Sequence, residues 1–326
     1  MKKKIYIHVG FHKTGTSSIQ DTCAKYRNEL LERNYDYLKI SYANKEINNH
    51  GIAIESIFRI NQNFFTITSE MCLSGEELKS SIDKARAEIT KKITKSDCDN
   101  IIISGEAIST LKKSELEKFK LYLENIKFEY EIICSIRSPY SFMCSDHQEV
   151  IKVNSALMED IFVRDKFSHV VNLDAVFKNR VRYYSFHEAC KWKTGITNHF
   201  LAYIGCKELP ETCKEIRSNN GLNNLSTRMY SFLNKKHPNI VSGKLNPLGR
   251  GFDTVDLDSQ KFLLTKEELT PLKSEIEEQN KLFLIGLVLN SVIKKIETID
   301  EVKLSVSQSY IAYDFHRSKN ITSSII

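Results

Sequence analysis

The start of the chain contains the feature that most constrains the fold. A short apolar run, from Ile5 to Val9, predicts a buried strand, and it breaks at Gly10. A loop with a second glycine, Gly15, then leads into a stretch with helical spacing. Two glycines at this spacing, between a strand and a helix, are typical of a phosphate-binding loop, in which backbone N–H groups and a helix N-terminus converge on an anion. The sequence therefore predicts a site for a phosphate-like group.

The lysine of this loop stands in an unusual position. The loop of nucleotide kinases has the pattern G-x-x-x-x-G-K-[ST], in which the lysine directly follows the second glycine. Here Thr16 follows Gly15, and Lys13 lies earlier, inside the loop. The positive charge therefore meets a different part of the bound anion, which favours a different reaction.

Composition excludes several other classes of protein. The chain has 326 residues, 41% of them hydrophobic, and a net charge of +6. Because no dense basic run with interleaved aromatic residues is present, we expect no nucleic-acid partner. The longest apolar run, Leu282 to Ile293, is too short to span a bilayer, so we expect no integral membrane segment.

The cysteines indicate a reducing compartment. All eight are scattered singly and none forms a C-x-x-C pair, so neither a zinc site nor a redox motif is expected. Free thiols persist in reducing compartments, and the N-terminus lacks the apolar core of a signal peptide. We therefore expect a cytoplasmic protein without a bound metal.

Strand and helix patterns alternate along the first two thirds of the chain. Strands are expected at 100–104, 130–136 and 180–186, and helices at 17–33 and from Pro139 to about Lys152. This alternation predicts an α/β fold, with a parallel β-sheet that contains the phosphate-binding loop and is flanked by helices. Two later helices, 225–236 and 266–296, predict a mainly helical C-terminal portion. We expect a single domain over residues 1–326, with an α/β core at 1–206 and a helical portion at 207–326.

Polar residues follow two of these strands where the chain leaves the sheet. Glu106 comes after the 100–104 strand, and Arg137 comes directly after the 130–136 strand. Ligands of open α/β sheets bind beyond the carboxyl ends of the strands, so both residues could face one cleft with the loop. Ser138, Ser141 and Ser145 share one helix face, which together with Arg137 predicts a second anion site. The alternative is that Arg137 makes its hydrogen bonds within the fold and that the three serines form a face of small residues against which another element packs.

Two motifs resemble those of a known family. The loop around Lys13 has the form K-[TS]-G-T-[ST], and Arg137 follows a buried strand with Ser145 eight residues later. In these motifs and their order, the chain resembles the sulfotransferases that use 3′-phosphoadenosine 5′-phosphosulfate (PAPS). It is most similar to the bacterial sulfotransferase-like branch of the P-loop sulfotransferase superfamily, over most of residues 1–235.

The resemblance implies roles for the loop and for the arginine motif. The co-substrate would be PAPS, with no metal. Arg137 and Ser145 would bind its 3′-phosphate. Lys13 would stabilise the charge that develops on the leaving phosphate oxygen. The 5′-phosphosulfate would be held by Lys13, Thr14, Gly15, Thr16, Ser17 and Ser18.

The resemblance also implies candidates for the general base. Glu106 ends the strand that often carries the base, and His50 lies in a region where other branches of the superfamily place one. Each has a structural alternative, since Glu106 could cap the next helix and His50 could be a loop histidine. His8 belongs to the first strand, and His12 occupies a position that is often proline in related loops, so neither is expected to be the base.

The resemblance and the loop together imply an enzyme. The expected reaction is transfer of a sulfuryl group from PAPS to a hydroxyl of an acceptor, and the expected acceptor is a carbohydrate or glycolipid. The alternatives are a P-loop nucleotide kinase or NTPase and a catalytically silent nucleotide-binding protein. The sequence names neither the acceptor nor the oligomeric state.

Overall fold

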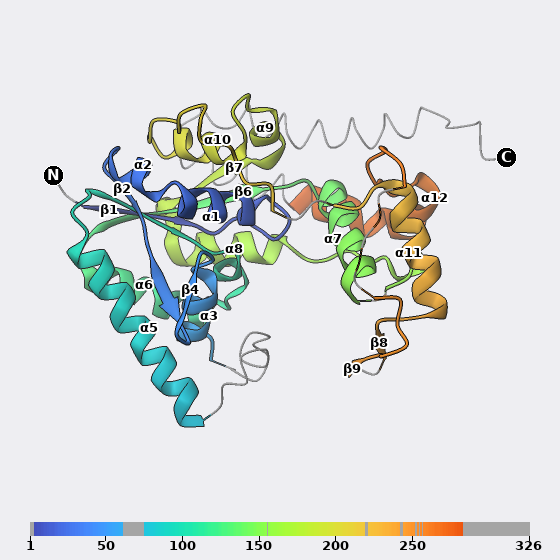
Figure 1. Cartoon of the computed structure of the whole chain (residues 1–326), viewed down its shortest axis with the longest axis horizontal. Coiled ribbons are helices and arrows are strands. Elements are labelled where there is room, and N and C mark those ends of the chain that lie inside the picture. Colours follow the sequence, from blue (N-terminus) through green and yellow to red (C-terminus); the bar gives the residue numbers. More distant parts are fainter. Residues whose placement is uncertain are drawn as a thin grey trace. The chain divides into compact units, whose positions relative to one another are not determined.

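The protein consists of two compact units, seen in a computed structural model (Figure 1). The first unit contains Met1–Ile136 and Ser168–Ser218, and the second contains Arg137–Phe167 and Asn219–Ile326. The structure describes residues 3–60, 75–154, 156–218, 221–241, 244–251, 253, 255 and 257–282.

A five-stranded sheet forms the centre of the first unit. Its order is β2-β5-β1-β6-β7, and every neighbouring pair is parallel. The parallel α/β fold expected from the sequence is thereby confirmed. The loop that is expected to bind phosphate follows the middle strand, whose neighbours are the two strands that precede Glu106 and Arg137. The strands are β1 (Lys4–His8), β2 (Tyr35–Tyr37), β5 (Asn100–Ser104), β6 (Glu129–Ile136) and β7 (Val181–Ser185).

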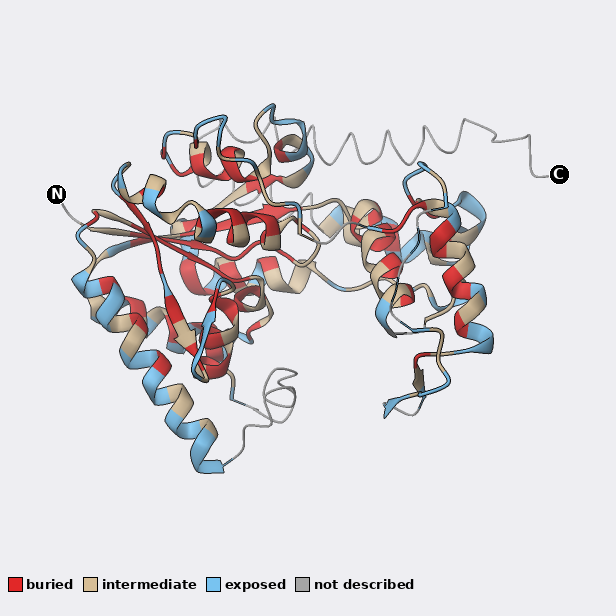
Figure 2. Cartoon of the chain, in the orientation of Figure 1, coloured by how far each residue is buried: buried red, intermediate tan, exposed pale blue. Residues whose placement is uncertain are grey.

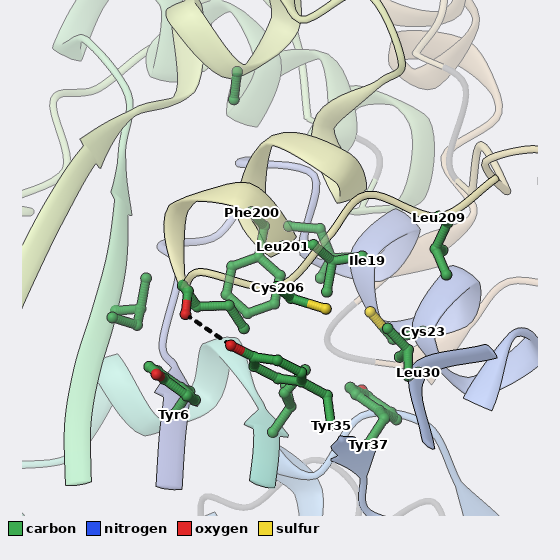
Figure 3. Packing of buried hydrophobic residues seen from close by; sticks show 14 of the residues in the cluster. Tyr6, Ile19, Cys23, Leu30, Tyr35, Tyr37, Phe200, Leu201, Cys206 and Leu209 are labelled. Atoms are coloured by element: carbon green, nitrogen blue, oxygen red, sulfur yellow. Dashed lines mark hydrogen bonds between the residues drawn. The ribbon is translucent and has the colours of Figure 1, made fainter. Parts of the chain in front are cut away.

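Helices α1 (Thr16–Lys25) and α10 (Ile196–Tyr203) cover one face of this sheet. Figure 3 shows their side chains, among them Ile19 and Phe200, packed over Tyr6 and Tyr35 of the strands. The hydroxyl of Tyr35 donates a hydrogen bond of 3.2 Å to the carbonyl of Ile204. This bond satisfies the one polar atom of Tyr35, so the ring can be buried with the apolar side chains.

The opposite face of the sheet is covered by α6 (Lys113–Ile126) and α8 (Phe167–Phe177). Phe119 of α6 and Tyr130 of β6 both pack edge-on against Phe177. Figure 2 shows that the central strands are buried, whereas the long helix α5 (Gly75–Lys95) exposes much of its surface. This unit also contains three further helices, α2 (Arg27–Leu31), α3 (Gly51–Phe58) and α9 (Phe186–Lys191). It contains a hairpin as well, formed by β3 (Ile40–Tyr42) and β4 (Lys45–Ile47).

The second unit packs α7 (Pro139–Asn154) against α11 (Asn224–Lys236). Tyr140 and Cys144 of α7 share a core with Phe262 and Leu264. Although α7 directly follows β6 in the sequence, its apolar face is thus buried by residues near the C-terminus. The boundaries of the units therefore differ from the division expected at residue 206. This unit also contains α12 (Lys266–Leu269) and the hairpin of β8 (Ile240–Val241) and β9 (Lys244–Leu245).

Two expected helices differ from the observed ones. The helix expected at 17–33 is divided into α1 and α2 at Tyr26. In the helix expected at 266–296, Pro271 lies in a 3-10 turn, Thr270–Leu272, that follows α12, and helix resumes at 273–282. The proline has no N–H to donate and disfavours an α-helical residue before it, so the regular helix ends there. Residues 283–296 lie outside the part of the chain that the structure describes.

Candidate functional site

The loop after β1 is bent by two residues in the left-handed region of backbone space. Lys13 has a φ of 65° and Gly15 a φ of 73°. Gly15 is the N-cap of α1, and a Cβ there would lie 2.2 Å from Cδ1 of Ile196, so only glycine fits. The hydroxyl of Thr14 donates a 2.5 Å hydrogen bond to the carbonyl of Phe11, which closes the loop on itself.

The first turn of α1 presents its backbone N–H groups at the loop. Ile19 N–H bonds to the carbonyl of Gly15 at 3.2 Å. The preceding N–H groups, those of Thr16, Ser17 and Ser18, therefore have no partner within the helix. Together with the positive end of the helix dipole, they form an environment that suits an anion.

Glu106 lies at this loop, as the first residue of a 3-10 turn (Glu106–Thr110) after β5. The hydroxyl of Thr16 donates to its Oε2, and Nδ1 of His12 lies 3.5 Å from its Oε1. Burial alone would raise the pKa of the Glu106 carboxyl, but its contacts with His12 and Thr16 and the charge of Lys13 outweigh burial and lower that pKa. Glu106 is therefore an ionised carboxylate at neutral pH.

A close backbone contact fixes the position of Glu106. A Cβ on Gly105 would lie 2.2 Å from the backbone nitrogen of Gly51, so the end of β5 touches the start of α3. The amide of Gly105 donates to the carbonyl of His8 at 2.9 Å, and the amide of His50 donates to the carbonyl of Ser104 at 2.9 Å. This crossing is the structural reason for the glycine of the Asn49-His50-Gly51 segment.

His50, the second candidate for the base, lies in the core. Its side chain is fully buried, its Nε2 donates to the carbonyl of Leu38 at 2.8 Å, and its Nδ1 accepts from the amide of Ser104 at 3.1 Å. Burial lowers the pKa of His50 to about 4. Both ring nitrogens of His50 therefore make hydrogen bonds within the fold. His50 packs next to β5 and does not face the loop site.

His12 is the residue of this site that sequence reasoning missed. Its imidazole is 41% exposed and lies beside the Glu106 carboxylate. Nothing local in the sequence shows this contact, because the two residues are far apart in the chain. The available signal was a histidine inside an anion-binding loop, next to Lys13.

Residues 216–218 run along α1, the helix that follows the loop, and contact it. The amide of Ile216 donates to the hydroxyl of Thr22 at 2.9 Å, and the amide of Ser218 donates to the hydroxyl of Ser18 at 3.3 Å. Arg217 lies between these contacts and is exposed to solvent. One more cation therefore borders the N-terminal half of α1.

Arg137 and Ser145 line one pocket of the second unit. Nε of Arg137 donates to the hydroxyl of Ser141 at 2.9 Å. The hydroxyl of Ser138 accepts from the amide of Ser141 at 3.3 Å, so Ser138 caps the N-terminus of α7. The pocket has a volume of about 460 Å³. Its lining includes a second cation, Lys261, that the sequence did not single out. The other lining residues are Cys144, Gln148, Gly221, Leu222, Asn223, Asp258, Ser259, Gln260, Phe262 and Leu263.

Within the residue ranges that the structure describes, no three His, Cys, Asp or Glu side chains are grouped so that they could hold a metal ion. No helix of the described part is long and apolar enough to cross a bilayer.

Comparison with known proteins gives two structural matches. No family profile matches the sequence, and no curated protein matches it. The sulfotransferase domain of the olefin synthase of Synechococcus PCC 7002 matches with a TM-score of 0.36 and 11% identity, over 76% of this chain and 93% of that one. A sulfotransferase domain from the curacin biosynthetic pathway matches with a TM-score of 0.35 and 12% identity, over 85% of this chain and 98% of that one. Both of these solved structures are sulfotransferase domains.

Proposed function

We propose that this protein is a sulfotransferase that transfers a sulfuryl group from PAPS to a hydroxyl of an acceptor. The main support for this proposal is the set of charged side chains at the loop. Lys13, whose own backbone is left-handed, lies inside the loop. Thr16 occupies the position at which a nucleotide kinase has its lysine, and its hydroxyl donates to the ionised Glu106 carboxylate. A cation and a carboxylate at one anion-binding loop suit a reaction that stabilises a leaving oxygen and deprotonates an attacking hydroxyl.

The loop would bind the 5′-phosphosulfate of the donor. Amides and hydroxyls of Thr14 to Ser18 provide donors to phosphate oxygens, and the helix dipole favours their negative charge. Lys13 would contact the oxygen that bridges phosphorus and sulfur. The negative charge on this oxygen grows as the S–O bond breaks, so the contribution of Lys13 is greatest in the transition state.

The Arg137 pocket would bind the 3′-phosphate of the same donor. Arg137, Ser145 and Lys261 line it, and a guanidinium can bond two phosphate oxygens at once. Arg250, a further arginine of this unit, donates to the carbonyls of Ile151 and Lys152 at 3.0 and 2.7 Å, which supports a role in holding the end of α7.

The acceptor side of the reaction would depend on Glu106. We propose that removal of the acceptor's proton depends on this carboxylate, whereas the bonds of His50 within the core speak against His50 as the base. The acceptor would be a hydroxyl of a carbohydrate or glycolipid. We place the reaction in the cytoplasm, since the seven cysteines of the described ranges are free thiols.

The alternative of a P-loop kinase or NTPase is disfavoured by Thr16, whose hydroxyl bonds to Glu106. A nucleotide-binding protein without catalytic activity is disfavoured because binding alone does not require a carboxylate beside the lysine of the loop.

Donor consumption tests the proposed function. We expect the purified protein to release adenosine 3′,5′-bisphosphate from PAPS in the presence of EDTA, and faster when a panel of glycosides and glycolipids supplies acceptor hydroxyls. Chromatography of the nucleotide and of ³⁵S-labelled products measures both. Hydrolysis of ATP or GTP with magnesium, without any consumption of PAPS, would instead establish the kinase or NTPase alternative.

A further inference from the structure

We propose that His12 receives the proton of the acceptor hydroxyl and that Glu106 positions His12 for this step. The inference rests on the proposed sulfuryl transfer and names the group that takes the proton. It starts from the chain of contacts Thr16, Glu106 and His12, which joins the first turn of α1 to the loop.

Glu106 is poorly suited to take the proton directly. One of its oxygens accepts the Thr16 hydroxyl, and the other lies 3.5 Å from His12 Nδ1. Only 22% of its side chain is exposed. The same contacts that hold this carboxylate also stabilise its ionised form, and a carboxylate stabilised in this way is a weak base.

His12 has the exposure and the orientation that a base requires. Its side chain is almost twice as exposed as that of Glu106, at 41% against 22%. With Nδ1 facing a carboxylate, the neutral imidazole is favoured as the Nδ1–H tautomer, because an N–H can donate to that carboxylate. The lone pair then lies on Nε2, on the other side of the ring, where an acceptor hydroxyl can reach it.

The charged groups around His12 support this assignment. Besides Glu106 and Lys13, the carboxylate of Glu55 on α3 interacts with His12 electrostatically, although Glu55 is already paired with Arg59. Two carboxylates thus stabilise the imidazolium that forms when the proton arrives.

The resulting reaction balances. The acceptor O–H bond breaks, its proton goes to Nε2 of His12, and the acceptor oxygen forms a bond to sulfur. The bond between sulfur and the 5′-phosphate oxygen breaks, and adenosine 3′,5′-bisphosphate leaves with the electron pair. The imidazolium later releases its proton to water, so no further reactant is needed.

The tautomer of His12 provides a test that needs no substrate. In long-range ¹H–¹⁵N spectra of the full-length protein, we expect neutral His12 to carry its proton on Nδ1. In Glu106→Gln we expect the tautomer to shift towards Nε2–H, because the negative charge that favours a proton on Nδ1 is gone. An Nε2–H tautomer in the wild-type protein would overturn the pairing.

Turnover of PAPS, with glycosides or water as acceptor, tests the proton transfer itself. His12→Asn retains an N–H donor near the position of Nδ1 and removes Nε2. We expect it to lower the turnover by on the order of 10²–10⁴, with the affinity for adenosine 3′,5′-bisphosphate unchanged. The matched control is His187→Asn, at an exposed histidine of the same unit, which should retain full turnover.

The outcomes separate this inference from the proposed function. A wild-type protein that consumes PAPS while His12→Asn is equally active would overturn the role of His12 and leave sulfuryl transfer standing. A wild-type protein that never consumes PAPS would overturn both. Loss of turnover in His12→Asn, together with a shift of the His12 tautomer towards Nε2–H in Glu106→Gln, is the expected result.

Discussion

Replacing Lys13 by alanine is expected to lower the turnover of PAPS by on the order of 10²–10³, while the affinity for adenosine 3′,5′-bisphosphate changes by less than about tenfold. The proposed partner of Lys13 is an oxygen that becomes fully charged only as the S–O bond breaks. Its ammonium group would therefore interact more strongly with the transition state than with the bound donor. Single-turnover kinetics and calorimetry measure the two quantities separately.

The control for this variant is Lys25→Ala. Lys25 is an exposed lysine in the last turn of α1, so its removal changes the net charge by the same amount at the other end of the loop helix. We expect its turnover to equal that of the wild-type protein. Equal losses of turnover and of nucleotide affinity in Lys13→Ala would make Lys13 a binding residue without a special role in the transition state.

Mild acid is expected to destabilise the first unit through two buried histidines. His8 and His50 are fully buried, and burial lowers the pKa of each to about 4, from 6.5. As the pH falls below 6.5, the unfolded chain binds protons at these histidines and the folded chain does not, so the free energy of unfolding decreases. Between pH 7.5 and pH 5 each histidine accounts for a loss of about 2 kcal/mol. Urea unfolding at the two pH values measures the sum, about 4 kcal/mol.

A histidine substitution isolates this effect. Glutamine can replace both hydrogen bonds of His50 but does not titrate, so His50→Gln should reduce the loss between pH 7.5 and pH 5 by about 2 kcal/mol, whatever its stability at pH 7.5. The exposed His187 provides the control, because His187→Gln should leave the loss unchanged. An identical pH dependence in wild type and His50→Gln would show that His50 binds protons equally well in the folded and the unfolded protein, contrary to its lowered pKa.

The central strands could be predicted because they are buried on both faces. β5 has the sequence Asn-Ile-Ile-Ile-Ser, and its expected bounds are the observed ones. The segment 34–60 contains β2, β3, β4 and α3, none of which is among the strands and helices expected from the sequence. Its Tyr37 and His50 look polar, but the Tyr37 hydroxyl donates to the carbonyl of Asn48 at 2.6 Å, and the His50 nitrogens are bonded as described above. Sequence patterns cannot show such partners in advance, so these residues did not mark a core.

The site was predictable where its chemistry is local. The loop with Lys13 is a contiguous motif, and Glu106 could be proposed from its place after a predicted strand together with the family resemblance. His12 and Lys261 could not be proposed, because their significance depends on contacts with distant residues. The two proposed anion sites also belong to different units, since α7 packs with Phe262 and Leu264.

Binding of adenosine 3′,5′-bisphosphate, compared with adenosine 5′-monophosphate in the presence of EDTA, tests the proposed donor most directly. A desolvated, charge-assisted contact of Arg137 with the 3′-phosphate would contribute roughly 2–4 kcal/mol, so calorimetry should show a preference of roughly 30- to 700-fold for the bisphosphate. Arg137→Ala should abolish most of this preference and Ser145→Ala should reduce it, whereas Lys235→Ala, at an exposed lysine of the same unit, should retain it. Equal affinities of the wild-type protein for the two nucleotides would contradict a donor that is phosphorylated at both ends.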